Sequence, residues 1–470
     1  MKYTILNISD LHKLLESKSH SRGMVAEILP FTVNLNKNIE IIGQNFRTVM
    51  GEFVRKICNL KLPETKDTDG DDLLESDRII EKVMQQIHFE PEEQPNLKRI
   101  LKQFIYNNQN YVNLFHPFMF TLINTPNKSE FRNFAQFLSD ILIQNNNDIK
   151  RIFLSKNTDN LLSDLILNNL DVIELENSKY VYQPLLDELT KKYQEDLMYI
   201  SKNNEFFLKN FELLTHFYIF MYICQLFIKF EGFEKGDFSK LTPLTFALDW
   251  EPMTKRREAI DPYSGYRRIS NNYHKLFVHI HTMSQLSNNS ICNPINQPKQ
   301  KMRFFHYKEI YDIFSAESSA IKDQFITDVN NWMEIYANIF NEKNITPKPK
   351  ALSLEDAFRN LFYSISEGVS FEAATKFGRH IERLAGSTFL KSRGRYGYIL
   401  NMTHNMLILL TAVCVKDERI PLKELFQRFK ERGVNFDRLS KKEIIQLLDS
   451  NNIIDKKSDS GDAQYVKPIL

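Results

Sequence analysis

The sequence predicts a mainly α-helical protein, and its composition carries the prediction. The 470 residues include only 14 Gly and 16 Pro, but 36 Phe and 19 Tyr. Few turn-forming residues and many large apolar ones favour long helices over a β-sandwich or a parallel α/β sheet. The apolar fraction of 42% and the charged fraction of 26% are those of a soluble globular protein. At about 100–200 residues per domain, the chain is long enough for two to four domains.

Residues 1–245 are predicted to form an acidic helical domain that begins with a short β element. Residues 24–31 and 39–42 are expected to be two strands around the turn NLNKN. Segment 45–60 has helical spacing, because its apolar side chains recur every three or four residues. Amphipathic helices then follow one another as far as residue 226.

Residues 206–230 are the most apolar stretch of the chain. Four polar residues interrupt it, namely Glu212, His216, Gln225 and Lys229. The uninterrupted part is shorter than the ~20 apolar residues that span a bilayer, so we expect a buried core helix. The N-terminus lacks the layout of a signal peptide, and the four cysteines form no CxxC pair. Both observations favour the reducing cytoplasm.

Residues 246–345 are predicted to be a helical middle region with a basic, tyrosine-containing loop. Within residues 250–273 the turn DPYSG separates two groups of cations, and three tyrosines lie among them. Guanidinium groups for phosphates beside aromatic rings for bases are a combination that holds nucleic acid. The candidate contacts are Lys255, Arg256, Arg257, Arg267 and Arg268. The alternative is a solvated hairpin that pairs with the acidic N-terminal half.

Residues 346–400 are predicted to be a basic helical connector. The helix over 371–384 has a basic outward face, formed by Lys376, Arg379, His380 and Arg383. A basic loop follows, with Lys391, Arg393 and Arg395. Its GRYG sequence matches the GXXG loop with which KH domains clamp a nucleic-acid backbone, although the flanking order is not that of a KH domain. Arg379, Arg383 and the three loop cations are therefore candidate phosphate contacts.

Residues 401–470 are predicted to contain three helices. The first is expected over 402–415, and the second between Pro421 and Gly433. Proline in the first turn and glycine just past the end are where these residues favour helix boundaries. The third helix is expected to begin at Ser440, with Glu443 completing a capping box.

The chain is predicted to end in a β-hairpin. Runs 453–457 and 463–469 flank the glycine-containing turn SDSGD. Three helices followed by a hairpin is the order of a winged helix-turn-helix, in which the third helix enters the major groove and the wing lies on the backbone. Cations at the start of the third helix and on the wing are expected to contact phosphates, namely Arg438, Lys441, Lys442, Lys456, Lys457 and Lys467. Winged helices also serve as protein–protein adaptors, and four nearby aspartates dilute the positive charge, so this alternative stays open.

The charge of the chain is unevenly spread. Residues 251–470 contain 33 Lys and Arg against 25 Asp and Glu, a net charge of +8, which leaves −6 for residues 1–250. This asymmetry favours a C-terminal half that faces nucleic acid and an N-terminal half that faces other partners.

The sequence contains none of the common catalytic or cofactor motifs. G-x-x-x-x-G-K-[ST], G-x-G-x-x-G, H-E-x-x-H and G-x-S-x-G are all missing, so neither a nucleotide cofactor nor a metal nor a catalytic residue is predicted. His274, His279 and His281 form the single histidine cluster. No carboxylate lies near them in the sequence, so we expect structural histidines.

Several segments resemble the family called DNA phosphorothioation-dependent restriction protein DptG (DndG). They are GRYGYILNMTHNMLILLTAVC at 394–414, KDERIPLKELFQRFKERGVNFDR at 416–438 and KKSDSGDAQYVKPIL at 456–470. Segment 19–31, SHSRGMVAEILPF, is similar as well. The resemblance extends from end to end and is most specific in the last 80 residues.

The resemblance implies a cytoplasmic subunit of a three-protein bacterial restriction module that acts on DNA without sulfur in its backbone. The implied partners are double-stranded DNA and the DptF and DptH proteins, an ATPase and a helicase- or translocase-like protein. We therefore expect a non-catalytic DNA-binding and assembly subunit. Two alternatives remain, a DNA-nicking nuclease of the same system and a scaffold that makes no DNA contact.

Overall fold

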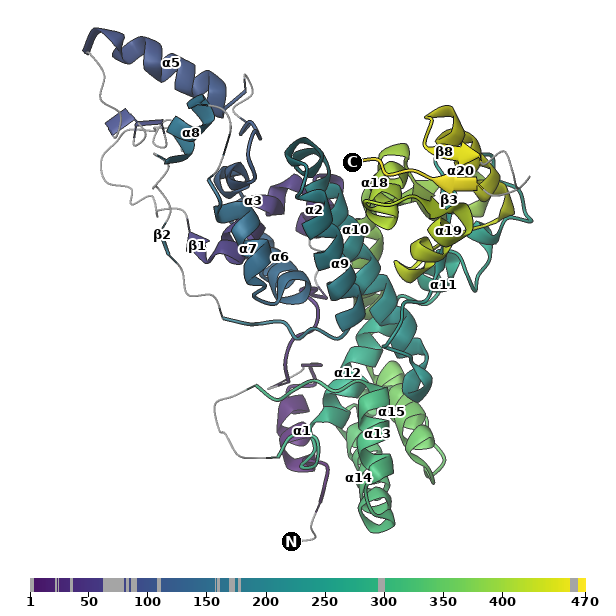
Figure 1. Ribbon diagram of the computed structural model, residues 1–470. Coiled ribbons are helices and arrows are strands. Elements are labelled where there is room, and N and C mark those ends of the chain that lie inside the picture. Colours follow the sequence, from purple (N-terminus) through teal and green to yellow (C-terminus); the bar gives the residue numbers. More distant parts are fainter. Residues whose placement is uncertain are drawn as a thin grey trace. The chain divides into compact units, whose positions relative to one another are not determined.

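The protein is mainly α-helical, as its composition predicts, and its sheets are small (Figure 1). The computed structural model describes residues 4–21, 23, 25–33, 37–61, 80–81, 84–85, 91–107, 111–156, 158, 161–168, 174–175, 179–294, 301–456 and 464–470.

The chain forms two compact units. The larger contains Met1–Gln44, Val181–Leu189 and Phe217–Pro468, and the smaller contains Asn45–Tyr180, Thr190–His216 and Ile469–Leu470. Helices α9 (Asp187–Ile200) and α10 (Asn204–Glu231) contribute residues to both. The four regions expected from the sequence, with boundaries after 245, 345 and 400, remain a prediction.

The described part of the smaller unit is helical apart from one short strand pair. Strands β1 (Leu60–Lys61) and β2 (Glu174–Leu175) are antiparallel. Helix α3 (Arg47–Cys58) buries Val49, Phe53 and Val54, as its spacing predicts. The other helical segments of this unit are η1 (Pro91–Glu93), α5 (Gln94–Ile105), η2 (Pro117–Leu122), α6 (Ser129–Leu138), the π-helical turn η3 (Ser139–Ile143), α7 (Asn147–Leu154) and α8 (Leu161–Asn168).

Residues 39–42 lie in a helix, so the strand expected there is wrong. Helix α2 (Lys37–Gln44) buries Ile39 and Ile42, which are three residues apart and so share one helix face. A Cβ on Gly43 would come within 2.0 Å of the carbonyl oxygen of Arg383 in helix α17 (His380–Phe389). This close packing of α2 on α17 outweighs the strand propensity of the isoleucines. In the other expected strand, Val25 and Glu27 form only isolated bridges.

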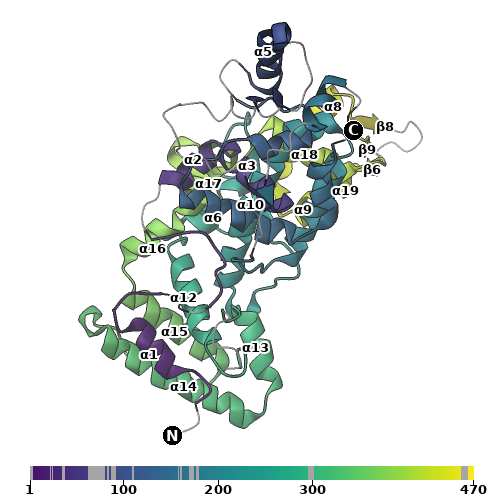
Figure 2. The same cartoon turned by 90° about the vertical axis from the view of Figure 1, so that its left-hand side faces the viewer.

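Four helices of the larger unit lie together, with α1 (Ile8–Leu15) alongside α14 (Figures 1 and 2). The four are α12 (Lys275–Ser287), α13 (Tyr307–Ala316), α14 (Ser319–Ile339) and α15 (Leu354–Gly368). The Ser353 hydroxyl accepts a hydrogen bond from the Asp356 amide at 3.1 Å and caps α15. Shorter helical segments of this unit are η4 (Phe233–Lys235), η5 (Glu258–Ile260), α11 (Arg267–Ser270), η6 (Asn341–Lys343), α16 (Phe371–Gly378) and η7 (Gly394–Tyr396).

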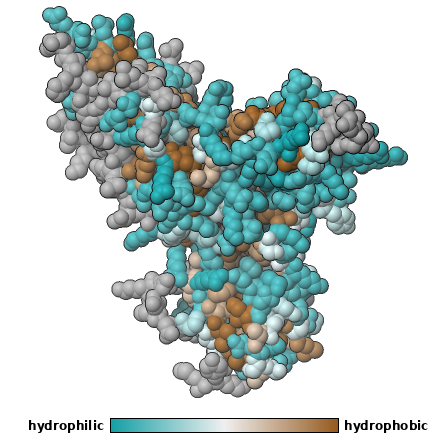
Figure 3. All heavy atoms as spheres, viewed as in Figure 1, coloured by the Kyte–Doolittle hydropathy of each residue, from teal (hydrophilic) through white to brown (hydrophobic). Residues whose placement is uncertain are grey.

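Helix α10 is a core helix, as predicted. Among the described helices it alone is long and apolar enough to cross a membrane, but 89% of its most apolar window is buried inside the protein. The surface in Figure 3 is mostly hydrophilic, and hydrophobic residues gather on it in separate patches. These features are compatible with a soluble protein.

A four-stranded sheet in the larger unit joins segments that are far apart in the sequence. Its order is β4–β5–β3–β7, and its strands are β3 (Leu244–Leu248), β4 (Leu390–Ser392), β5 (Tyr398–Met402) and β7 (Val434–Phe436). Strand β3 is parallel to β5 and β7, with Leu248 opposite Met402 and Phe246 opposite Phe436. Strands β4 and β5 form an antiparallel hairpin. The sequence did not predict these strands, because runs of five residues or fewer show no clear alternation.

The last 70 residues contain three helices and a three-stranded antiparallel sheet. The helices are α18 (His404–Val415), α19 (Leu422–Glu431) and α20 (Arg438–Ser450). Strands β6 (Ile420–Pro421), β8 (Ile454–Lys456) and β9 (Gln464–Val466) pair in the order β6–β9–β8. The predicted hairpin is therefore present, with Asp455 opposite Tyr465. Its turn lies outside the described residues.

Two of the predicted helix starts in this segment need correction. Helix α18 begins at His404, because Asn401 and Met402 belong to β5. Helix α20 begins at Arg438, because the Asp437 carboxylate accepts hydrogen bonds from the amides of residues 439 and 440 at 3.0 Å. Aspartate caps a helix start in this way, so the expected Ser440 capping box is wrong.

Candidate nucleic-acid interface

The carboxyl ends of three parallel strands lie at one edge of the four-stranded sheet. Strand β3 leads into residues 249–252, β5 leads through Thr403 into α18, and β7 leads through Asp437 into α20. In open sheets this edge is where ligands commonly bind. The N-termini of the two helices add partial positive charge there. Three of the predicted basic segments lie next to this edge, namely those that contain Arg257, Lys391 and Arg438.

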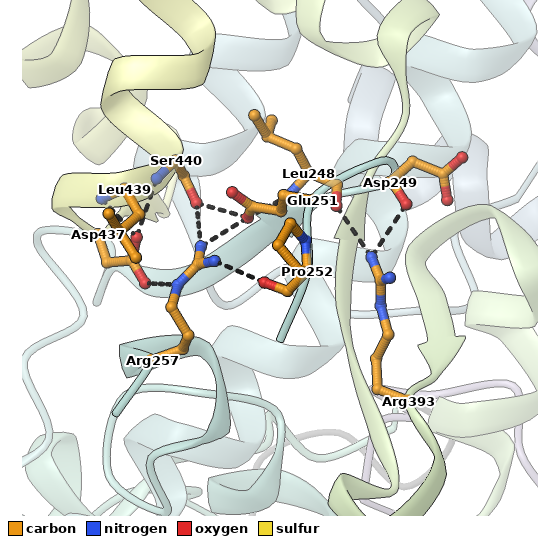
Figure 4. Close-up of polar contacts among 9 residues, drawn as sticks. All are labelled: Leu248, Asp249, Glu251, Pro252, Arg257, Arg393, Asp437, Leu439 and Ser440. Carbon is orange, nitrogen blue, oxygen red and sulfur yellow. Dashed lines mark hydrogen bonds and ion pairs between the residues drawn. The ribbon is translucent and has the colours of Figure 1, made fainter. Parts of the chain in front are cut away.

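Arg257 is buried in a polar network that joins the segment after β3 to α20 (Figure 4). Its Nε donates to Asp437 Oδ2 at 2.5 Å, and its Nη2 donates to Glu251 Oε1 at 2.7 Å and to Ser440 Oγ at 2.8 Å. Ser440 Oγ donates in turn to Glu251 Oε1 at 2.7 Å. Only 3% of the Arg257 side chain is exposed. We call these four residues the Arg257 clamp.

The clamp compensates charges that burial would otherwise destabilise. Burial opposes ionisation of Asp437, but the hydrogen bond from Arg257 and the backbone amides of α20 outweigh it and lower the pKa of this carboxyl. Removing one partner of such a pair leaves an uncompensated buried charge and costs about 3–5 kcal/mol. Arg257 is therefore a structural residue. Its prediction as a DNA contact is corrected, because the buried guanidinium is already held by the clamp.

Two more predicted contacts anchor the β4–β5 hairpin to the end of β3. Arg393 Nη2 donates to the carbonyl oxygens of Leu248 and Asp249, each at 3.0 Å (Figure 4). Lys391 Nζ donates to the Asp249 carboxylate at 2.7 Å and to its carbonyl oxygen at 2.9 Å. The hydrogen bond from Lys391 lowers the pKa of Asp249. These two cations hold the turn after β3 to the hairpin.

Three further arginines contact backbone or aromatic groups near the hairpin. Arg267 Nη2 donates to the Tyr396 carbonyl oxygen at 3.1 Å, and Arg268 Nη1 donates to that of Tyr263 at 3.4 Å. Burial lowers the pKa of Arg268. Arg395 at the hairpin tip lies 4.9 Å from the Tyr396 ring centre, with its Nη2 donating to the ring hydroxyl at 2.8 Å. Of the three, only Arg395 is well exposed.

Four predicted contacts beside the clamp are exposed, namely Lys255, Arg256, Arg438 and Lys442. In the part of the chain that the structure describes, none of their side chains has an ion pair or a hydrogen bond. Consecutive Cα atoms are about 3.8 Å apart, so the contact between Arg257 and Asp437 keeps Arg256 and Arg438 in one neighbourhood. We call these four residues the basic patch. Half-buried Lys441 is beside them, with its Nζ 5.5 Å from the ring centre of Phe426.

Of the three lysines predicted on the wing, the structure describes the side chain of Lys467. Lys467 Nζ lies 3.7 Å from Asp455 Oδ1, so its charge is partly neutralised. The backbone of Lys456 lies in β8, but its side chain is outside the described part of the chain, as is all of Lys457.

The predicted basic face of residues 371–384 is only partly correct. Arg379 is exposed and Arg383 half-buried, and both line a cleft. His380 is instead buried, with its ring centre 4.9 Å from that of Phe31 and its Nε2 3.0 Å from the Thr32 carbonyl oxygen. Lys376 forms an ion pair with Glu372 at 2.5 Å.

In the histidine cluster, His279 has a structural role and a carboxylate partner that the sequence did not indicate. His279 is fully buried on α12, with Nε2 2.8 Å from Glu231 at the end of α10 and Nδ1 3.1 Å from the Tyr307 hydroxyl. Burial is the main reason why the pKa of His279 is lowered. Within the described residues, no three His, Cys, Asp or Glu side chains are grouped so as to hold a metal ion.

The sequence missed the carboxylates that neutralise its basic segments. Asp437 is 180 residues from Arg257, and Asp249 is 142 residues from Lys391. The only local signal was the acidic residue that begins the EPMTKRRE segment, Glu251, six residues before Arg257.

No family model matches the chain, and no curated protein is significantly similar to it in sequence. The resemblance to the DptG family therefore stays a prediction.

Proposed function

We propose that the chain is a non-catalytic DNA-binding and assembly subunit of a phosphorothioation-dependent restriction complex that acts on unmodified DNA. The resemblance of residues 394–470 suggests the restriction system and its DptF- and DptH-type partners. The contact with DNA is argued from the side chains of the basic patch.

The cations in the first turn of α20 are the observation that carries the proposal. Arg438 and Lys441 lie there, Lys442 follows directly, and the first turn contains no acidic residue. The helix dipole disfavours cations at this end, typically by about 0.3–1 kcal/mol for each charge. Helix stability therefore does not explain these residues, whereas binding of a polyanion does. Because the clamp holds Arg257 to Asp437, directly before α20, it also keeps Lys255 and Arg256 near these cations.

Within this proposal, residues 401–470 form a winged helix-turn-helix. The order of α18, β6, α19, α20 and the β8–β9 hairpin supports it, as does the pairing of β6 with β9. Helix α20 would then approach the major groove, and the hairpin would lie along the backbone. Deleting these residues is not a clean test, because β7 and the end of β5 would leave the four-stranded sheet.

The test is fluorescence-anisotropy binding of the full-length chain to a phosphorothioated and an unmodified duplex across a salt series. We expect binding that weakens steeply with salt, and the slope should become shallower by about 0.9 for each phosphate that a variant no longer binds. Two double variants remove parts of the basic patch, Lys255→Glu/Arg256→Glu and Arg438→Glu/Lys442→Glu. The matched control is Lys13→Glu/Lys343→Glu, which makes the same charge change at exposed positions elsewhere in the larger unit.

The patch variants should bind every duplex sequence more weakly, and the control should bind as the unchanged chain does. Equal binding by all variants would remove the patch from the interface. No binding even at low salt would instead favour the scaffold alternative. Metal-dependent nicking by the isolated chain would favour the nuclease alternative.

A further inference from the structure

A charged cleft of about 690 Å³ lies between α2, α17 and the β4–β5 hairpin, all within the larger unit. Its walls depend on two glycines. A Cβ on Gly43 would meet the Arg383 carbonyl oxygen, and one on Gly386 would come within 2.6 Å of the Gly43 carbonyl oxygen. Gly386 also interrupts α17 with a φ of 51°, which a residue with a side chain rarely adopts. The cleft is therefore built into the packing of α2 on α17.

Charges of both signs line this cleft. Three cations and three carboxylates line it, namely Arg379, Arg383, Lys391, Glu40, Asp249 and Glu382. A surface that follows a phosphate backbone is basic throughout, so this lining differs from the basic patch. Donors and acceptors at fixed places suit a compact ligand that carries both an anionic group and hydrogen-bonding edges.

The hairpin side of the cleft adds an aromatic ring and a buried amide. Tyr398 is 48% exposed and lines the cleft at the start of β5. Asn401 also lines it, is only 2% exposed and hydrogen-bonds through its side chain to Asp249. Its Oδ1 has no hydrogen-bond partner among the described residues. Buried polar groups are normally paired, so this acceptor points to a donor from outside the chain.

We propose that the cleft binds a single nucleotide unit. The base stacks on Tyr398, and its phosphate binds the exposed guanidinium of Arg379. Arg379 is already oriented by a hydrogen bond to Tyr273. Stacking on an aromatic side chain and charge-assisted binding of the phosphate are how single-stranded nucleic acid is held.

The source of the nucleotide is either an unpaired position in DNA, which rests on the proposed function, or a free nucleotide. The cleft would then engage DNA differently from the basic patch, which would contact the backbone of a duplex. Extruding a base from a duplex costs a few kcal/mol, so a mismatched or single-stranded position is favoured.

The experiment uses the full-length chain and a fluorescent ten-nucleotide single strand, measured by anisotropy. An otherwise identical strand of abasic nucleotides is the first competitor, and a deoxynucleoside monophosphate is the second. We expect Tyr398→Ala to weaken binding of the normal strand by roughly 5- to 150-fold, the usual range for losing one stacked base. Arg379→Ala should weaken both strands. Tyr363→Ala, an exposed tyrosine on α15, and Lys376→Ala are the matched controls.

The proposal is supported if the abasic strand competes poorly and if Tyr398→Ala removes the preference for bases. Competition by the monophosphate alone would identify a free nucleotide as the ligand and would still support the site. Equal binding of normal and abasic strands, or no change with either Tyr398→Ala or Arg379→Ala, would overturn it. Salt-sensitive duplex binding through the basic patch would survive that result, so the two proposals fail separately.

Discussion

The Arg257 clamp and the basic patch are built from the same two sequence segments, yet they use their charges in opposite ways. Arg257 and Asp437 are buried and neutralise each other, whereas the adjacent residues Arg256 and Arg438 are exposed and have no partner among the described residues. The clamp uses its charge to hold α20 against the segment after β3. The patch leaves its charge available to a ligand.

The difference shows that a run of basic residues in a sequence is not yet a binding surface. Lys391 and Arg393 anchor the hairpin through Asp249 and backbone carbonyls, although they belong to the run that most resembles a phosphate-binding loop. Arg395, two residues later, is exposed at the tip. Burial and the distance to a carboxylate decide which cation supports the fold and which remains available to a ligand.

The largest effect that tests this comparison is expected from Arg257→Ala. The variant should lower the free energy of unfolding of the larger unit by about 3–5 kcal/mol, because Glu251 and Asp437 would remain buried without their partner. Urea denaturation of the full chain measures it. The control Arg256→Ala should stay within about 0.5 kcal/mol of the unchanged chain. Equal stability of the two variants would contradict the distinction between clamp and patch.

A smaller effect is expected from acid acting on the same clamp. The folded-state pKa of Asp437 is lowered, so its contribution to stability is complete above the ordinary aspartate range and is lost as the pH falls through the folded-state pKa. At neutral pH Asp437→Asn should cost about 1.5–3 kcal/mol, the usual value of a hydrogen bond to a charged group.

The gap in unfolding free energy between this variant and the unchanged chain should be constant above the ordinary aspartate range. It should close only as the pH falls through the lowered folded-state pKa of Asp437. Asparagine still caps helices well, so the variant isolates the charge from the cap. A gap that is independent of pH would show that the carboxylate charge does not matter.

Arg393 and Arg395 of the hairpin allow the same comparison between an anchoring and an exposed cation. Arg393→Ala should cost about 1–2 kcal/mol, because the carbonyl oxygens of Leu248 and Asp249 lose a donor. Arg395→Ala should be close to neutral for stability. Thermal unfolding of both variants beside the unchanged chain measures the difference, and the reverse order would show that the tip, not the anchor, holds the hairpin.

The smallest structural effect is expected from Lys442→Ala, which removes one exposed charge of the patch. Stability should change by no more than about 0.5 kcal/mol. The slope of the logarithm of DNA affinity against the logarithm of salt concentration should fall by about one, uniformly across DNA sequences. A loss confined to one DNA sequence would instead assign Lys442 to base contact.

Elements that depend on local spacing could be predicted from the sequence. The buried face of α3, the core helix α10 and the terminal hairpin all follow from the recurrence of apolar residues and from turn composition. The sequence pattern gave a wrong helix start where both a serine and an aspartate could cap the same helix. Ser440 was a plausible cap, but Asp437 lies three residues earlier and caps α20.

By itself the sequence determined the helical class of the protein and the places where its positive charges gather. The tertiary structure decided which of those charges are available. Strands β3, β5 and β7 are too short to be recognised from their sequence pattern. They form one sheet because residues about 150 and 190 positions apart pair in register. That pairing brings Asp437 to Arg257 and Asp249 to Lys391. Partners so distant leave no periodic trace in a sequence, because periodicity records only neighbours along one element.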